Sequence, residues 1–120
     1  MPYIQVICNL SSNGVDQVKV MTAISKGLAT ALDKPEQIVM VHLNMDTSMQ
    51  FQTTDAPCAM IHVRSIGKVD AQHNPTTALA LTEIVSQELN IPADRIFINI
   101  ADVQPSNWAK GGVLISEPKH

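Results

Sequence analysis

The second residue of this 120-residue chain is a proline, and its position gives it a chemistry that no internal residue has. The initiator methionine is normally removed when the next residue is small, and proline qualifies. Removal would leave a secondary amine at the chain terminus, where an α-amino group has an ordinary pKa of about 7.7–8.0. Burial and a nearby cation both lower the pKa of an amine. Pro2 is therefore a candidate general base at physiological pH, and the alternative is that this proline merely favours an extended start.

The other reactive residue types do not form a recognisable catalytic cluster. Cys8 and Cys58 are far apart, and neither belongs to a CxxC pair. We interpret them as buried reduced thiols of a cytosolic protein, with a disulfide or a redox role as the alternative. His42 and His62 fall on different predicted strands without the spacing of a metal site, so we expect interface or channel histidines and no metal. The sequence also has no glycine-rich phosphate loop and no Ser-His-Asp order.

Length and composition are those of a single globular domain spanning residues 1–120. The net charge is −3 and the basic residues are scattered singly, which argues against nucleic-acid and membrane-surface binding. The first residues lack the pattern of a secretory signal, and no stretch approaches the roughly 18 apolar residues of a membrane span. We therefore expect a cytoplasmic protein with no nucleic-acid or membrane partner. Export without a signal peptide stays open.

The chain repeats one plan twice, and this plan must position any catalytic residue. Residues 3–9 predict a strand, 14–33 an amphipathic helix and 38–45 a second strand, after a break at Pro35. Residues 58–65, 74–89 and 96–102 predict the same strand, helix and strand. Asn74 suits the N-cap of the second helix and Pro75 its first position. The apolar residues at helical spacing in the first helix are Val18, Met21, Ile24, Leu28 and Leu32.

The two repeats, about 2–46 and 57–102, are joined by a polar linker and followed by a tail over 103–120. They predict an α+β fold with a four-stranded sheet and two helices on one face. One face of each strand is apolar and should lie under the helices: Ile4, Val6, Cys8, Val39, Val41, Leu43, Ala59, Ile61, Val63, Ile96, Ile98 and Ile100.

The opposite face of the sheet is mixed in character. It carries Tyr3, Gln5, Ile7, Ile38, Met40, His42, Cys58, Met60, His62, Arg64, Phe97 and Asn99. This face holds too many apolar groups for a surface in water, yet two helices cannot cover both sides of one sheet. Burial against other copies of the chain resolves the conflict, so we expect an oligomer.

Four stretches of the sequence together resemble the macrophage migration inhibitory factor family of the tautomerase superfamily. They are MPYIQV, KPEQIVMVH, APCAMIHVRSIGK and PADRIFIN, and the similarity runs from Met1 to about Asp102. The combination of Pro2, Lys34, SIGK and DRxxIN is specific, whereas each element alone would be weak. The resemblance implies homotrimers of double β-α-β subunits, with active sites at subunit interfaces and an N-terminal proline as the catalytic base.

Residue by residue, the resemblance implies that Pro2 takes the proton and that Lys34 holds a substrate carboxylate while lowering the pKa of Pro2. It also implies that the backbone at Ser65 and Ile66 contributes to the site, and that Asn99 reaches in from the adjacent subunit. The alternatives are a solvated Lys34 and an Asn99 that is simply a satisfied polar group of the interface. Because Ile66 is apolar, it can only shape the pocket or bind through its backbone.

The chain also departs from the family pattern. Phe97 stands where the family commonly has a tyrosine, so a phenolic donor is missing near the substrate, and Ile38 replaces a common aromatic residue. The animal cytokine of the family has a CxxC thiol pair. In this chain Cys58 occupies the first cysteine position of that pair and Ile61 the second, so the pair is broken. We therefore do not expect thiol–disulfide oxidoreductase activity. Trp108 fits the C-terminal tryptophan of the family, but the terminal aromatic of the pocket rim is replaced near Val113 or Leu114.

The resemblance implies a keto-enol tautomerase that needs no cofactor and acts on small carboxylate-bearing keto acids with an aromatic or hydrophobic tail. Such an enzyme would be similar to phenylpyruvate tautomerase, with dopachrome isomerisation as a further activity. One alternative is a cytokine-like ligand with a vestigial pocket, for which a receptor protein would be a partner. A third hypothesis is a hydratase or decarboxylase of the superfamily. That chemistry would usually require further pocket arginines or acids, and Arg64 is the only arginine near the motif.

Overall fold

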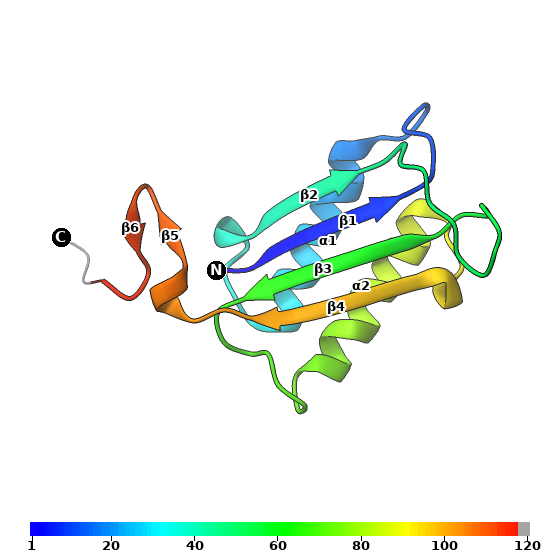
Figure 1. Ribbon diagram of the computed structural model, residues 1–120. Helices are drawn as coiled ribbons and strands as arrows, with labels where there is room; N and C mark the ends of the chain where they lie inside the picture. Colours follow the sequence, from blue (N-terminus) through cyan, green and yellow to red (C-terminus); the bar gives the residue numbers. More distant parts are fainter. Residues whose placement is uncertain (118–120) are drawn as a thin grey trace.

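The computed structural model describes residues 1–117 and places both repeats in one four-stranded sheet (Figure 1). The first repeat contains β1 (Tyr3–Cys8), α1 (Gln17–Leu32) and β2 (Met40–Asn44). The second contains β3 (Ala59–Ser65), α2 (Asn74–Leu89) and β4 (Ile96–Asp102). Single turns of 3₁₀ helix, η1 (Glu36–Ile38) and η2 (Ala93–Arg95), lead into β2 and β4. The predicted α+β fold of two β-α-β repeats is confirmed.

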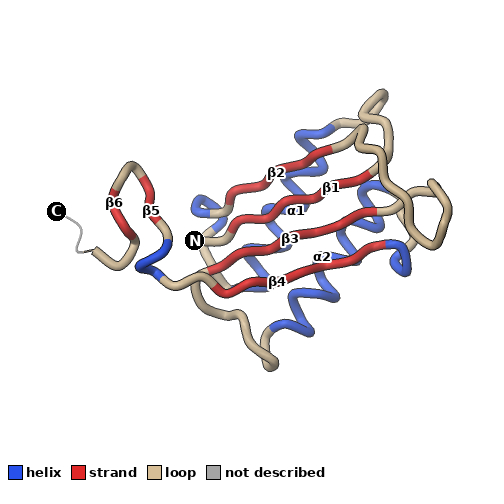
Figure 2. The backbone as a smooth tube through the Cα atoms, in the orientation of Figure 1, coloured by secondary structure: helices blue, strands red, loops and turns tan. Residues whose placement is uncertain are grey.

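The strands lie in the order β2-β1-β3-β4, and both helices cover the same face of the sheet (Figure 2). The strands of each repeat are parallel, whereas β1 and β3 are antiparallel at the centre. Tyr3 pairs with Arg64 and Cys8 pairs with Ala59. This register places the start of the chain beside the end of β3, so residues 61 positions apart in the sequence, Tyr3 and Arg64, meet at one end of the sheet.

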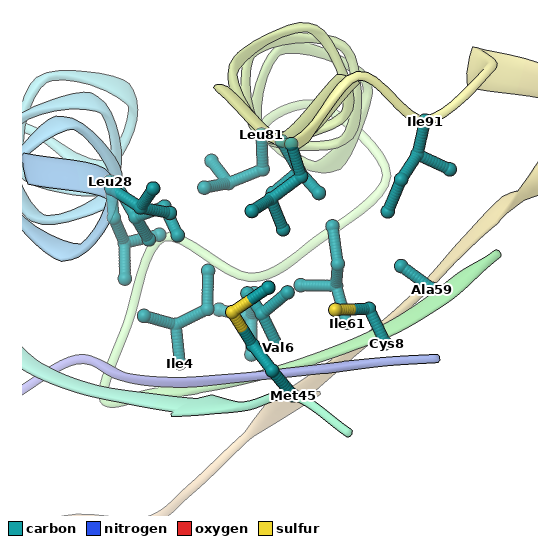
Figure 3. Close-up of a cluster of buried hydrophobic side chains, with 14 of the residues drawn as sticks. Ile4, Val6, Cys8, Leu28, Met45, Ala59, Ile61, Leu81 and Ile91 are labelled. Atoms are coloured by element: carbon teal, nitrogen blue, oxygen red, sulfur yellow. The ribbon is translucent and has the colours of Figure 1, made fainter. Parts of the chain in front are cut away.

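The hydrophobic core lies between the sheet and the two helices, as the alternation of the strands predicts. Side chains from β1 and β3 point up toward Leu28 of α1 and Leu81 of α2 (Figure 3). The residues of the predicted apolar face are either fully buried or packed against the core. At about 25 cal/mol per Å² of apolar surface removed from water, this layer is the main source of stability.

The prediction for the start of the first helix was wrong at Val18. The helix begins at Gln17, where Asp16 Oδ1 accepts a hydrogen bond of 3.1 Å from the backbone N–H of Lys19. Val18 is 70% exposed, and Val20 is buried instead. The buried residues of α1 recur every four positions from Val20. Val18 precedes Val20 by two residues, which correspond to about 200° of rotation, so Val18 lies on the opposite side of the helix.

Three further details differ from the sequence-based predictions. Ile38 lies in η1, since β2 begins only at Met40. Cys58 precedes β3 and is buried, so it does not belong to the open face, and its N–H donates to Asn9 Oδ1 at 2.9 Å. The N-cap of α2 is His73 rather than Asn74, because an Asp70-centred turn leads into the helix.

A small hairpin follows the second repeat and lies beyond the end of the sheet, close to the start of the chain (Figure 1). It consists of η3 (Pro105–Asn107), β5 (Ala109–Lys110) and β6 (Val113–Leu114). Its two-residue loop is Gly111-Gly112, with φ values of 60° and 85°. Two consecutive residues with positive φ match the tight turn that suits the twist of a hairpin, and glycine takes this conformation without steric cost.

Arg95, the arginine of the DRIFIN stretch, holds the linker between the repeats. Its guanidinium donates to four backbone carbonyls of residues 51–57 at 2.9–3.3 Å. It also lies 5.3 Å from the centre of the Phe51 ring, which meets the Phe97 ring edge-on at 4.9 Å. These contacts assign Arg95 a structural role.

Among residues 1–117, no helix is long and apolar enough to cross a membrane.

Candidate active site

A pocket of about 680 Å³ opens where the chain begins, between the end of the sheet and the C-terminal hairpin. Its wall on one side comes from the first residues of the chain and from the segment that leads into β2. The hairpin and Arg64, the last residue but one of β3, line the pocket as well. The lining residues are Met1, Pro2, Tyr3, Gln37, Ile38, Val39, Met40, Arg64, Val103, Asn107, Trp108, Ala109 and Lys110.

Pro2 forms part of the pocket wall and is less than 2% exposed. Its carbonyl accepts a hydrogen bond of 3.0 Å from the N–H of Met40, which extends the parallel pairing of β1 with β2 by one step. A proline has no N–H to offer the sheet, so the first position before an inner strand suits it. The first strand, β1, therefore begins immediately after Pro2 and holds the proline ring at the pocket.

The amino terminus lies in an environment that favours a neutral amine. Burial lowers the pKa of the Met1 amino group, and the positive charge of Lys34 lowers this pKa further. With Met1 attached, the nitrogen of Pro2 is an amide whose lone pair is delocalised. The terminal amine in this structure therefore belongs to Met1, one residue away from the proposed base.

Lys34 lies beside the terminus rather than in the pocket itself. It follows Asp33, which ends α1 in the left-handed conformation with a φ of 52°, and its N–H donates to the carbonyl of Ala29 at 2.9 Å. Its side chain lines an adjoining depression on the helix side, together with Lys26 and Glu36. The structure thus brings the charge of Lys34 to the terminus without placing it among the lining residues around Pro2.

The backbone at Ser65 and Ile66 is held close to the chain start. The register that pairs Tyr3 with Arg64 sets Ser65 opposite Pro2, one step further along. Ser65 is buried, its hydroxyl donates to the carbonyl of Gly67 at 3.1 Å, and its own carbonyl accepts from Val103 at 2.9 Å. The loop therefore has a fixed backbone at the position where the resemblance implies a contribution to the site.

Phe97 and Asn99 do not approach Pro2 within one chain. They pair with Met60 and His62 on β3, which are level with Ile7 and Gln5 on β1. Two strand spacings separate β4 from β1, or roughly 10 Å, and each residue adds about 3.3 Å along the strand. Asn99 is therefore about 14 Å from Pro2 and Phe97 about 19 Å. Both are exposed on the open face, so they could act only in a site formed with another copy.

Several of the lining residues were not predicted from the sequence as part of the site. Arg64 had no predicted role, and Tyr3 and Lys110 were not among the predicted site residues. The Gly-Gly dipeptide between two short apolar runs is a recognisable hairpin signal and could have identified the element that carries Lys110. The pairing of Tyr3 with Arg64 has no such signal, because it depends on the register of two distant strands.

The histidines do not gather into a metal site in the part of the chain that the structure describes. No group of three or more His, Cys, Asp or Glu side chains there is arranged to hold a metal ion. His42 instead lies on β2 with Nδ1 at 3.2 Å from the hydroxyl of Tyr3. Both cysteines are buried and unpaired, and burial raises the pKa of the Cys8 thiol.

The fold and the pocket define a small α+β protein of the double β-α-β class, with its cavity at the amino terminus and the fold of the tautomerase superfamily. A family model described as Macrophage migration inhibitory factor (MIF) matches residues 1–116. The chain belongs to this family, and the resemblance drawn from its motifs is confirmed.

Relatives and solved structures agree with this assignment. The chain is 31% identical over 112 residues to macrophage migration inhibitory factor of Xenopus tropicalis, covering 93% of this chain and 96% of the relative. It is 34% identical, with the same coverage, to the homolog of Brugia malayi. The crystal structure of the Prochlorococcus marinus homologue matches with a TM-score of 0.88 and 29% identity, covering 95% of this chain and 99% of the other. The Toxoplasma gondii protein matches with a TM-score of 0.83 and 29% identity, over 93% and 98% of the two chains.

Proposed function

We propose that this protein is a keto-enol tautomerase that uses Pro2, after removal of Met1, as a general base on small keto acids. The observation that supports it most directly is a largely apolar pocket at the chain start, where burial and Lys34 lower the pKa of the amino group of Met1, the residue next to Pro2. A neutral secondary amine next to an apolar cavity can remove a proton from a carbon beside a carbonyl. Membership of the MIF family supports the same reaction class.

In the proposed reaction, the lone pair of the Pro2 nitrogen removes the enol hydroxyl proton while the carbonyl forms. The protonated amine then returns a proton to the neighbouring carbon, so the enzyme ends unchanged. In this proposal Lys34 reaches the substrate carboxylate from the depression beside the terminus. The backbone at Ser65 and Ile66, which lies next to Pro2 by the register of β1 and β3, borders the reacting group. Phenylpyruvate is the simplest test substrate, and dopachrome isomerisation is a further activity of the same kind.

We propose further that the site is completed in a homotrimer. Phe97 and Asn99 are too far from Pro2 in one chain, but they lie exposed on the open face of the sheet. In a ring of identical subunits, one copy can present this face to the pocket of the next. We also propose a cytoplasmic location, because two buried and unpaired cysteines fit a reducing compartment.

The decisive experiment compares two samples that differ only at the amino terminus. One has Met1 fully removed, as verified by mass spectrometry, and the other retains it behind a fused tag. Only the first should catalyse the ketonisation of enol-phenylpyruvate, since an amide nitrogen cannot accept the proton. General-base catalysis contributes about 10²–10⁴-fold, so the contrast should be large. Pro2→Gly keeps a terminal amine and should lose less activity than the blocked sample.

Equal turnover by both samples would reduce Pro2 to the start of a strand and remove the basis of the enzymatic proposal. A Met1-free protein that is folded and oligomeric but inactive on every keto acid would instead favour the cytokine-like alternative with a vestigial pocket. Circular dichroism of both samples serves as the folding control.

A further inference from the structure

The pocket at Pro2 has a charge opposite to that of the whole chain. The sequence contains 11 acidic and 8 basic residues, yet none of the 13 lining residues is Asp or Glu. Two of them are cationic, Arg64 and Lys110, and they border an apolar surface formed by residues such as Ile38 and Met40. Such a cavity attracts anions, because low-dielectric walls strengthen the field of each fixed charge.

Arg64 is built into the sheet at a defined position. Its neighbours Val63 and Ser65 are buried, so the alternation of β3 directs the side chain of Arg64 to the open face, beside Tyr3. Within residues 1–117 the side chain of Arg64 makes neither an ion pair nor a hydrogen bond, since the ion pair found there joins His73 to Asp70. Arg95, by contrast, directs its donors to the carbonyls of the linker. Within the described part of a single chain, the planar set of donors of Arg64 is therefore available for a carboxylate.

Lys110 supplies a second cation from the hairpin. It is the last residue of β5 before the Gly111-Gly112 turn, and it lines the same pocket as Arg64. No carboxylate among residues 1–117 lies within ion-pair distance of its ammonium group. The hairpin thus carries a positive charge over a cavity that already contains an arginine.

These two cations are distinct from the lysine that acts on the terminus. Lys34 belongs to the helix side and lines a separate depression, whereas Arg64 projects on the open face of the sheet. Under the proposed function, the carboxylate beside the reacting carbonyl faces Lys34. Arg64 and Lys110 then have no anion to bind if the rest of the substrate is purely apolar. Cations beside an apolar wall are stabilised when an anion pairs with them.

We propose that the pocket prefers substrates with two acidic groups, such as 2-keto dicarboxylic acids, and that Arg64 and Lys110 bind the second carboxylate. The inference rests on the proposed function and defines its substrate class, since that function assigns one carboxylate to Lys34 and leaves Arg64 and Lys110, which line the pocket from other elements, for the second. Arg64 and Lys110 are specificity-determining residues in this account, and Pro2 performs the same proton transfer.

A binding experiment tests the inference without requiring turnover. Trp108 is the only tryptophan of the chain and lines the pocket, so its fluorescence reports occupancy. Glutarate and pentanoate, which have the same five carbons but two and one carboxylates, are titrated into the Met1-free protein. We expect glutarate to bind at least tenfold more tightly. Arg64→Gln and Lys110→Gln should each weaken glutarate by about 10–100-fold, the range for a hydrogen bond to a charged group, and change pentanoate by less than threefold.

A kinetic experiment examines the same discrimination during catalysis. The enols of oxaloacetate and phenylpyruvate carry two and one carboxylates, and their ketonisation is followed in ultraviolet light. Arg64→Gln should lower kcat/KM for oxaloacetate by raising KM. This loss should be at least tenfold larger than the loss of kcat/KM for phenylpyruvate. Arg64→Lys should restore part of the loss, because it keeps the charge. Lys19→Gln, which removes an exposed lysine of α1, should leave both substrates unchanged.

The outcomes separate this inference from the proposed function. If the wild-type protein turns over phenylpyruvate and Arg64→Gln loses activity equally on both substrates, the proposed preference for diacids is wrong. The tautomerase proposal would then still stand. Absence of turnover would remove the tautomerase, and the glutarate titration would still decide whether the pocket binds diacids. Arg64→Gln that reduces the oligomer mass but not glutarate affinity would reassign Arg64 to a subunit contact and contradict the inference.

Discussion

At the scale of single residues, the chemistry depends on how the surroundings of one nitrogen shift its protonation. Burial is the larger cause of the lowered pKa at the amino terminus, and Lys34 is the second. Both disfavour the protonated form, so the neutral base is available at a lower pH than for an exposed amine. Lys34 is not among the residues that line the pocket, yet its positive charge still lowers the pKa of the terminal amine.

We therefore predict the effect of Lys34→Gln on the pH–rate profile of the Met1-free enzyme. Removing the positive charge raises the pKa of the base, so the acidic limb of kcat/KM should move to higher pH. KM for phenylpyruvate should rise as well, because anchoring a carboxylate in a partly buried site contributes about 2–5 kcal/mol. Lys26→Gln removes another charge from the same depression and is the matched control. An unchanged acidic limb in Lys34→Gln would make Lys34 an ordinary surface charge.

At the scale of elements, the two helices pack closely at one glycine. A Cβ atom added to Gly27 of α1 would overlap Cδ1 of Ile84 on α2. Glycine inside a helix is about 1 kcal/mol less favourable than alanine, so its presence here is explained by the close approach of the helices. This contact sets the distance between α1 and α2, and hence how both helices lie on the sheet that carries the pocket.

The prediction at this scale is a double-mutant cycle. Gly27→Ala alone should be neutral or destabilising, since overpacking costs about 1–3 kcal/mol and cancels the gain in helix propensity. In an Ile84→Val background, which lacks Cδ1, the same change should stabilise by about 0.5–1 kcal/mol. The free energy of unfolding is measured in urea at fixed protein concentration. A coupling energy below about 0.5 kcal/mol would show that Ile84 moves away without cost.

At the scale of the whole molecule, no helix among residues 1–117 covers the second face of the sheet. Met40 on β2 and Phe97 on β4 are 65% and 54% exposed, at the two edges of the sheet. The helices lie entirely on the other face (Figure 2). Apolar side chains distributed in this way on a central sheet are typical of a surface that is buried between subunits.

We predict that light scattering at micromolar concentration gives about three times the subunit mass of 13.0 kDa. Met40→Glu should reduce the mass toward that of a monomer, because it places a charge where another copy would pack. Val18→Glu is the matched control, since Val18 is equally exposed but lies on α1, away from the open face. A wild-type mass equal to one subunit would contradict the trimer and with it the shared site.

Much of the fold and part of the site could be predicted from the sequence, because they depend on local patterns. Alternating strands and helical spacing indicated which residues face the core, from Ile4 and Val6 to Leu28. Errors were confined to element ends such as Val18 and Ile38, where one or two residues decide the face. The position of Pro2 in front of the first strand and the spacing of the motifs also indicated the family correctly.

Only the tertiary structure decided what surrounds Pro2. Arg64 reaches the pocket because the register of β1 and β3 pairs it with Tyr3, and Lys110 because the hairpin returns to the chain start. It also separated Lys34 from the pocket lining, and Phe97 and Asn99 from Pro2. Register and chain return join residues far apart in the sequence, and local periodicity carries no information about such distances. The sequence determined which residues face the core, while the contacts between distant segments determined which charged residues line the pocket.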